Sequence, residues 1–117
     1  MHELIIRDQP VRAVIAAVNI PVSIKIRLCS PVEDTVELAK RLEAAGVSHI
    51  ALHARFPSAK NRRHGAAKLE HVKDLAAALS IPVLSNGNVR CFGDLAANLQ
   101  STGAAGLMVG EELMRNP

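Results

Sequence analysis

The 117 residues are 49% hydrophobic and 21% charged, and the formal net charge is +3. This composition excludes a disordered or low-complexity chain, and the mild positive charge is compatible with a polyanionic partner without requiring one. No apolar run reaches the roughly 18 residues of a membrane-spanning helix and no signal-peptide core is present, so we expect no membrane segment and a cytoplasmic location. Cys29 and Cys91 form no metal-binding spacing and are expected to be free thiols.

Taken in chain order, the sequence predicts one helix followed by four repeats of strand, loop and helix. The first helix is expected at residues 10–18, and the strands at residues 22–28, 49–53, 81–86 and 106–109. A short helix at residues 111–115 follows the last strand. This alternation predicts an α/β fold with a parallel sheet. No domain boundary interrupts residues 1–117, and four βα units fit either a half-barrel fragment of a TIM (β/α)8 barrel or a small open sheet.

Helix ends and buried faces are also predicted between the strands. Ser30, with Pro31 and Glu33 behind it, predicts the beginning of the second helix, and Gly46 predicts its end. The apolar stripes expected to face the core are Val36, Ala39 and Leu42, then Leu69, Val72, Leu75 and Leu79, and finally Phe92, Leu95 and Leu99.

Functional residues in both architectures lie at the carboxyl ends of the strands and in the loops that follow them. In the first strand, alternation puts Lys25 on the face opposite Ile24 and Ile26. A lysine inside a barrel needs an anionic or electron-rich partner, whereas a lysine on an edge strand only faces solvent, and the pattern leaves both open. His53 and Arg55 leave the second strand together and can donate hydrogen bonds to a phosphate or a carbonyl oxygen. A purely structural histidine is the alternative for His53.

A turn of Asn86, Gly87 and Asn88 follows the third strand, and Gly110 ends the fourth strand before the short helix. Glycine lets a ligand approach the backbone and the carboxamides can donate and accept, so these residues predict a phosphate site. A turn that requires positive φ explains the same residues without a ligand. Glu111 would repel a phosphate unless its side chain turns away or pairs with a cation.

The segment from Arg55 to Lys68 is the most basic stretch of the chain. It also contains Lys60, Arg62, Arg63 and His64. A long basic loop at this end of a sheet can contact a nucleic-acid backbone, although a solvated surface loop is the more ordinary interpretation.

Five motifs in this order resemble the second half of the tRNA-dihydrouridine synthase barrel. They are Pro21-Val22-Ser23-Ile24-Lys25-Ile26-Arg27, Ala44-Ala45-Gly46-Val47, Leu52-His53-Ala54-Arg55, Ile81-Pro82-Val83-Leu84-Ser85-Asn86-Gly87-Asn88-Val89 and Gly106-Leu107-Met108-Val109-Gly110. Asn88, the Gly110-Glu111 pair and Gly65-Ala66-Ala67 resemble the eukaryotic branch that modifies positions 16 and 17 of tRNA. Glu111 departs from the arginine that most relatives carry after this glycine.

The resemblance implies a TIM-barrel oxidoreductase that uses FMN, with NADPH as reductant, to reduce uridine in tRNA to 5,6-dihydrouridine. It implies that Lys25 and His53 contact the flavin, and that Arg55 and the basic segment face the tRNA. The positions that it assigns to the flavin phosphate are Asn86, Gly87, Asn88, Gly110 and Glu111. The family's proton-donating cysteine lies in an Asn-x-x-x-Cys-Pro-like loop. The sequence has no such motif, so no catalytic residue is expected in this chain.

Two other functions stay open. Another FMN barrel, such as a dihydroorotate dehydrogenase relative, would share the strand-end lysine and the glycines. A noncatalytic RNA-binding or scaffold half-barrel would bind tRNA without flavin. Because a half-barrel exposes two sheet edges, the expected partner is either the missing N-terminal half-barrel or a second copy of the chain in a homodimer.

Overall fold

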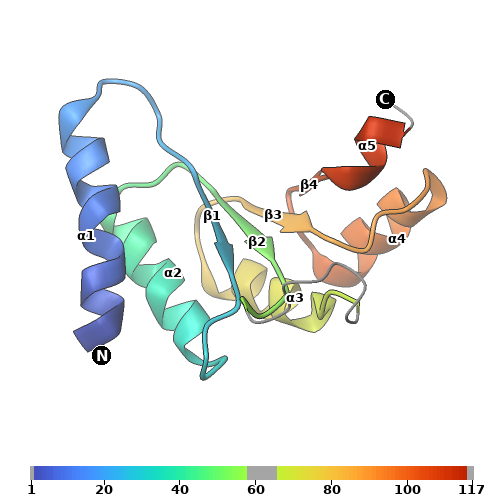
Figure 1. The fold of residues 1–117 in the computed structure, drawn as a ribbon, viewed down its shortest axis with the longest axis horizontal. Coiled ribbons are helices and arrows are strands. Elements are labelled where there is room, and N and C mark those ends of the chain that lie inside the picture. The colour runs from blue at the N-terminus through green and yellow to red at the C-terminus, as the bar shows by residue number, and fades with distance from the viewer. Residues whose placement is uncertain (1, 58–65, 116–117) are drawn as a thin grey trace.

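A computed structural model describes residues 2–57 and 66–115, and side chains within these ranges except those of residues 2–7, 111 and 115. The chain alternates helices and strands throughout (Figure 1). The elements are α1 (His2–Ala17), β1 (Ile24–Arg27), α2 (Asp34–Ala45), β2 (Ile50–His53), α3 (Leu69–Ala78), β3 (Val83–Asn86), α4 (Gly93–Thr102), β4 (Gly106–Met108) and α5 (Glu111–Arg115).

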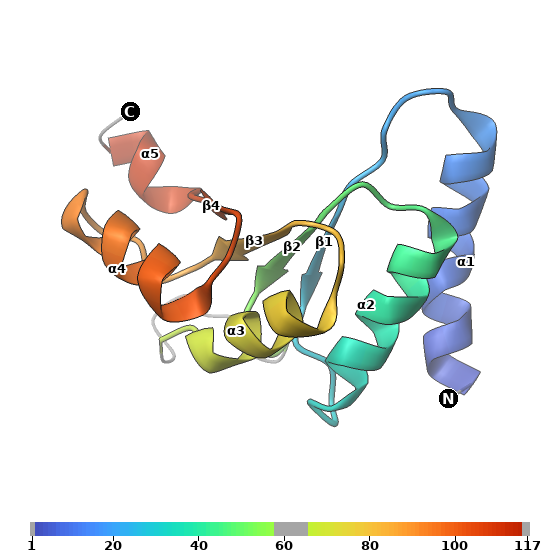
Figure 2. The ribbon, with the colours of Figure 1, turned by 180° about the vertical axis from the view of Figure 1, so that it is seen from behind.

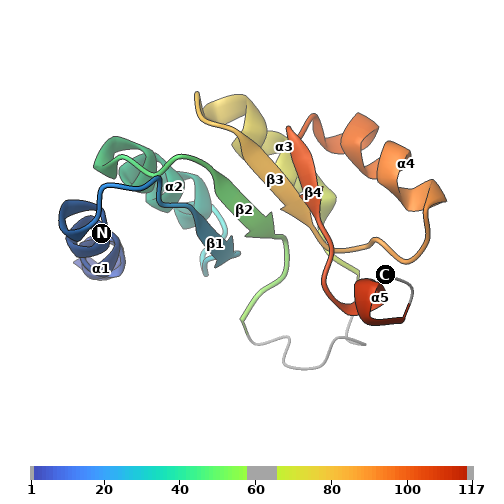
Figure 3. The same ribbon diagram turned by 90° about the horizontal axis from the view of Figure 1, so that it is seen from above.

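The four strands form one parallel sheet in the order β1-β2-β3-β4, so each strand pairs with its neighbour in sequence. The helices α1 to α4 line one side of this sheet, and α5 lies beyond the carboxyl end of β4 (Figures 2 and 3). The predicted α/β fold with four βα units is therefore confirmed. None of the helices in the described part of the chain combines the length and apolar character needed to cross a membrane.

The hydrophobic core lies between the sheet and the helices. Its largest buried side chains include Leu42 of α2, Ile50 and Leu52 of β2, and Val72 and Leu75 of α3. Each such side chain stabilises the fold by roughly 1.5–3 kcal/mol when it leaves water. The sheet therefore has one face held against the helices, and strand alternation directs every second side chain to the opposite face.

Two polar contacts fasten the helices to their surroundings. The Glu43 carboxylate, near the end of α2, accepts hydrogen bonds from the backbone N–H groups of Ser80 and Ile81 at 2.7 and 3.1 Å. The buried Asp8 carboxylate of α1 pairs with Arg12 at 3.1 Å and with Arg41 of α2 at 3.5 Å. These contacts fix α1 against α2 and α2 against the chain that enters β3.

The two earliest helices differ from the sequence-based expectation at their amino ends. Helix α1 begins at His2 and contains Pro10, whereas the expected helix began at Pro10. Helix α2 begins at Asp34, and Ser30 does not cap it. The backbone N–H groups of Asp34 and Thr35 instead bond to the carbonyls of residues 31 and 32, so a tight turn occupies the predicted first turn of the helix. Gly46 ends α2 in the left-handed conformation, as predicted.

The buried faces of α2 and α3 contain the predicted residues or their neighbours, but the stripe predicted for α4 is wrong. Phe92 is 89% exposed and Leu99 is 37% exposed, while Asn98 and Thr102 are buried. These two polar side chains take the inner positions because they complete hydrogen bonds to backbone carbonyls. The Asn98 amide donates to the carbonyl of Gly87, and the Thr102 hydroxyl donates to the carbonyl of Asn98.

Candidate functional site

Two of the predicted site residues, His53 and Asn86, lie in one row across the carboxyl ends of the strands. The strand register aligns Arg27 of β1 with His53 of β2, His53 with Asn86 of β3, and Asn86 with Met108 of β4. Lys25 lies two residues before Arg27 and therefore on the same face. Ile24 and Ile26 pack against the core on the other face, while Lys25 and Arg27 are exposed. The predicted alternation in β1 is thus confirmed.

Arg27 belongs to this row but was not among the predicted site residues. Its guanidinium donates a hydrogen bond of 3.4 Å to the carbonyl of Phe56, just after β2. The same alternation that selected Lys25 could have found it, because residues two apart in a strand share a face. Arg27, Lys25 and the nearby Arg55 together surround His53 with positive charge.

His53 is neutral at physiological pH. Its pKa is lowered from 6.5 to about 4, first by burial and then by the charges of Lys25, Arg55 and Arg27. A neutral imidazole offers one N–H donor and one acceptor. The row therefore combines fixed cations with a neutral hydrogen-bonding ring, which suits an anionic or electron-rich ligand.

The lowered pKa of His53 predicts a specific dependence of stability on pH. Between pH 6.5 and about 4 the unfolded chain binds a proton at His53 that the folded chain does not. The free energy of unfolding therefore falls as the pH drops through this window. Urea denaturation of the wild type should show a larger loss than the His53→Gln variant, and NMR titration of the imidazole should give a midpoint well below 6.5. A midpoint near 6.5 would show that the cations do not act on the ring.

The turn after β3 carries the backbone geometry predicted for it. Gly87 has φ of 118° and Asn88 has φ of 60°, both in the region that favours glycine. The Asn86 amide donates a hydrogen bond of 2.7 Å to the carbonyl of Met108, which ties the end of β3 to the end of β4. A Cβ atom on Gly87 would lie 2.7 Å from the Cβ of Ala67 and 3.3 Å from the His53 ring. Glycine is therefore required by local packing as well as by φ.

The Asn88 side chain is hydrogen-bonded to the backbone of a different segment. Its oxygen accepts from the N–H of Ala67 at 2.7 Å, and its amide donates to the carbonyl of Ala67 at 2.8 Å. Sequence reasoning did not anticipate this contact. It brings the turn after β3 against the chain that enters α3.

Gly110 lies after β4 at the beginning of α5, with open space where a Cβ atom would stand. Glu111 is the first residue of α5, and its side chain lies outside the described part. The same holds for the four basic or imidazole side chains in the middle of the basic segment, Lys60, Arg62, Arg63 and His64.

Both described ends of the basic segment lie close to the row. The carbonyl of Arg55 accepts from the N–H of Leu28 at 3.0 Å, next to the end of β1. At the other end, the N–H of Lys68 donates to the carbonyl of Ala54 at 2.8 Å, and the Lys68 ammonium lies 5.3 Å from the centre of the Phe56 ring. The basic segment therefore leaves and rejoins the fold beside His53.

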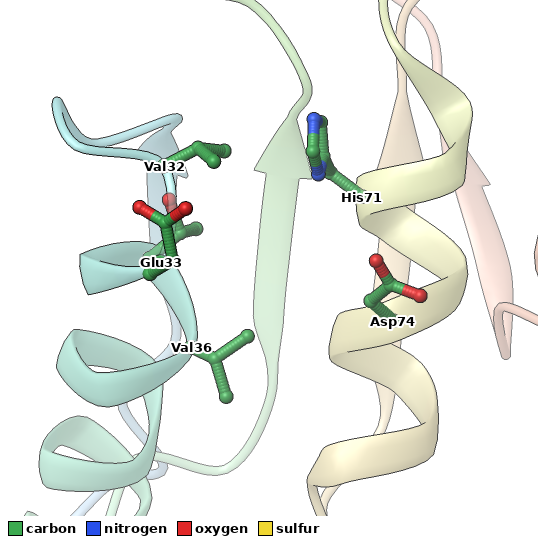
Figure 4. Close-up of a pocket in the computed structure, with 6 residues that line it drawn as sticks. Val32, Glu33, Val36, His71 and Asp74 are labelled. Carbon is green, nitrogen blue, oxygen red and sulfur yellow. The ribbon is translucent and has the colours of Figure 1, made fainter.

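A hollow away from these strand ends lies between α2 and α3. It has a volume of about 440 Å³, and its lining includes Val36 and Glu33 from one side and His71 and Asp74 from the other (Figure 4). None of the predicted site residues lines it. Nor do the described residues contain a group of three or more His, Cys, Asp or Glu side chains that could hold a metal ion. Cys29 is buried and Cys91 is exposed, and neither forms a disulfide.

Parallel βα units that gather cations, a carboxamide and glycines at the carboxyl ends of their strands are typical of a β/α barrel. The chain belongs to the dihydrouridine synthase family, because the family model described as Dihydrouridine synthase (Dus) matches residues 3–117. The family fold is a TIM barrel, of which these four βα units are a fragment. This match favours the dihydrouridine synthases over the dihydroorotate dehydrogenase alternative.

Three relatives illustrate the similarity. The chain is 38% identical over 99 residues to a tRNA-dihydrouridine(16/17) synthase [NAD(P)(+)]-like protein of Rattus norvegicus, covering 85% of the chain and 23% of the relative. It is 36% identical to a probable tRNA-dihydrouridine synthase of Aquifex aeolicus, covering 85% and 31%. It is 32% identical to tRNA-dihydrouridine synthase B of Vibrio vulnificus, covering 94% and 34%. The chain thus spans about a third or less of the length of these relatives.

Proposed function

We propose that the chain is the C-terminal half of the catalytic barrel of an FMN-dependent tRNA-dihydrouridine synthase. The observation that carries this proposal is the row of Arg27, His53 and Asn86 across three strand ends, with Lys25 on the same face. The names of the relatives support tRNA uridine as the substrate, and the (16/17) synthase-like relative of Rattus norvegicus supports that branch of the family.

The residues of this chain fit a flavin mononucleotide. Gly110 leaves open space beside the end of β4, and Gly87 turns the backbone after β3 with a φ of 118°. Glycines at the last two strand ends suit a phosphate group, because backbone N–H groups can approach it. Lys25 and His53 supply a cation and a neutral donor for the electron-rich ring, which is the chemistry that flavin carbonyl and nitrogen atoms require.

When bound and reduced by NADPH, FMN would supply the hydride that reduces the C5–C6 double bond of uridine. On this proposal Asn86, Gly87, Gly110 and the backbone of Asn88 hold the phosphate end, and Lys25 and His53 orient the ring. Glu111 stands at the position of the family's phosphate-binding arginine, and a carboxylate there repels the phosphate unless it turns away or pairs with a cation. Arg55 and the basic segment contact the RNA backbone, which makes tRNA binding weaken with salt.

The proton that completes the reduction comes from outside this chain. The sequence contains no Asn-x-x-x-Cys-Pro-like loop. Cys29 is buried in the core, and Cys91 lies in the exposed connection between β3 and α4. Neither thiol belongs to the row of strand-end residues, so we assign no catalytic residue to residues 1–117.

A second half-barrel completes the site. In the described fold, β1 and β4 each pair with only one strand, which leaves two sheet edges to be covered. Exposed apolar side chains include Ile20, in the connection before β1, and Met114, in the helix α5 after β4. The N-terminal half-barrel of the family covers both edges on this proposal, and a second copy of the chain is the alternative occupant. Sedimentation of the purified chain separates the two, because the alternative predicts a dimer.

The function is tested by reconstitution. The chain is mixed with the N-terminal half-barrel of the Aquifex aeolicus relative, FMN, NADPH and an unmodified tRNA transcript, and dihydrouridine is measured by mass spectrometry. We expect flavin binding and dihydrouridine in the mixture, and none from the chain alone. Binding of tRNA without any flavin binding or product would replace the proposal with the noncatalytic RNA-binding alternative.

A further inference from the structure

Asn88 makes a paired contact that its position in a phosphate turn does not require. We propose that Asn88 is a positioning residue that holds the β2–α3 connection against the strand ends through Ala67, and that its side chain is not a ligand of the flavin phosphate. The expected effect on flavin binding rests on the proposed function. The positioning of the β2–α3 connection by Asn88 does not depend on that function.

The contact uses the two kinds of group that a carboxamide offers. One oxygen accepts from the Ala67 N–H at 2.7 Å and one N–H donates to the Ala67 carbonyl at 2.8 Å. One side chain thus satisfies both the N–H and the carbonyl of Ala67, as a paired strand would satisfy them. Ala67 is only 6% exposed, so its backbone groups would lack water if Asn88 were removed.

Three further contacts show which parts of the fold the pairing of Asn88 with Ala67 holds in place. Ala67 lies against Gly87, where an added Cβ atom would approach its own Cβ to 2.7 Å. The next residue, Lys68, donates its N–H to the carbonyl of Ala54 at 2.8 Å, directly after β2. The His53 ring lies on the same side of Gly87. Asn88 therefore determines where the basic segment rejoins the fold and helps to keep His53 covered.

The conformation of Asn88 offers a clean substitution. Glycine adopts a φ of 60° without strain, so Asn88→Gly keeps the turn and removes the side chain with its carboxamide. Asn88→Asp keeps the acceptor for the Ala67 N–H and places a second oxygen against the Ala67 carbonyl, so it should give a partial effect. Asn19→Gly, the same change at an exposed residue of the α1–β1 connection, is the matched control.

The first measurements need no flavin. In Asn88→Gly we expect hydrogen exchange at the Ala67 and Lys68 amides to accelerate at least tenfold relative to the Leu42 amide, and the pKa of His53 to rise toward 6.5. Asn19→Gly should change neither. Unchanged exchange and an unchanged His53 titration in Asn88→Gly would overturn the proposal whether or not the chain binds flavin.

The second measurement compares FMN with riboflavin, which lacks the phosphate, in the reconstituted barrel. A positioning role predicts that Asn88→Gly weakens both ligands by the same factor. A loss confined to FMN would identify Asn88 as a phosphate ligand and overturn the proposal. Absence of flavin binding in the wild type would refute the proposed function, while the exchange and titration results would still decide the role of Asn88.

Discussion

Replacing Gly87 with alanine will lower the free energy of unfolding by about 2–5 kcal/mol, the sum of a positive-φ penalty and the cost of overpacking. The first term arises because φ is 118° at this residue. The second arises because the new Cβ would lie 2.7 Å from the Cβ of Ala67, whose backbone is held by Asn88 and cannot easily retreat. Urea denaturation followed by circular dichroism measures the change.

Gly103→Ala is the control for the Gly87 variant. Gly103 also has positive φ, at 68°, but nothing lies within 4 Å of an added Cβ atom. This variant should lose only about 1–2 kcal/mol, the backbone term alone. Equal losses in the two variants would mean that Ala67 does not lie against Gly87 in solution.

The layout of the fold could be predicted from the sequence because it depends on local patterns. Short apolar runs separated by helical stripes predict the four strands, and their alternation predicts that Lys25 lies opposite Ile24 and Ile26. Helix ends proved less predictable. Gly46 ends α2 because its positive φ is a local property, whereas Ser30 fails to cap because a turn that begins at residue 31 leads into the helix.

The face of α4 could not be predicted, because contacts with a distant segment determine it. Asn98 is buried since its amide reaches the carbonyl of Gly87, 11 residues earlier in the chain. The apolar stripe of the sequence predicts that α4 turns its other face to the core and buries Phe92. Polar side chains that form hydrogen bonds with a neighbouring backbone can thus take inner positions in place of apolar side chains.

The same distinction holds for the candidate site. Placement of His53 and Asn86 at strand ends follows from the sequence, and parallel pairing brings them together. The contact between Asn88 and Ala67 joins residues 21 apart, and the pKa of His53 depends on charges from β1. Predicting this contact and this pKa requires the register of the strands and the path of the connections, and the periodicity of the sequence gives neither.

Lys25→Met is expected to weaken FMN binding in the reconstituted barrel about 10- to 100-fold, since a charge-assisted hydrogen bond contributes roughly 1.5–3 kcal/mol. The methionine keeps the length of the side chain and removes only the ammonium group. Fluorescence quenching of the flavin measures the affinity. Lys40→Met, the same change at an exposed residue of α2, should leave the affinity unchanged.

The Lys25 variant also tests the two interpretations of this residue separately. Lys25 is the largest charge effect on His53, so removing it should raise the pKa of His53 even without flavin. A raised pKa together with weaker FMN binding supports a lysine that faces the ligand inside a barrel. A raised pKa with unchanged FMN affinity would mean that Lys25 only adjusts the protonation of His53. No change in either would leave Lys25 as a solvent-facing residue of an edge strand, and the phosphate end of the site would then have to account for flavin binding.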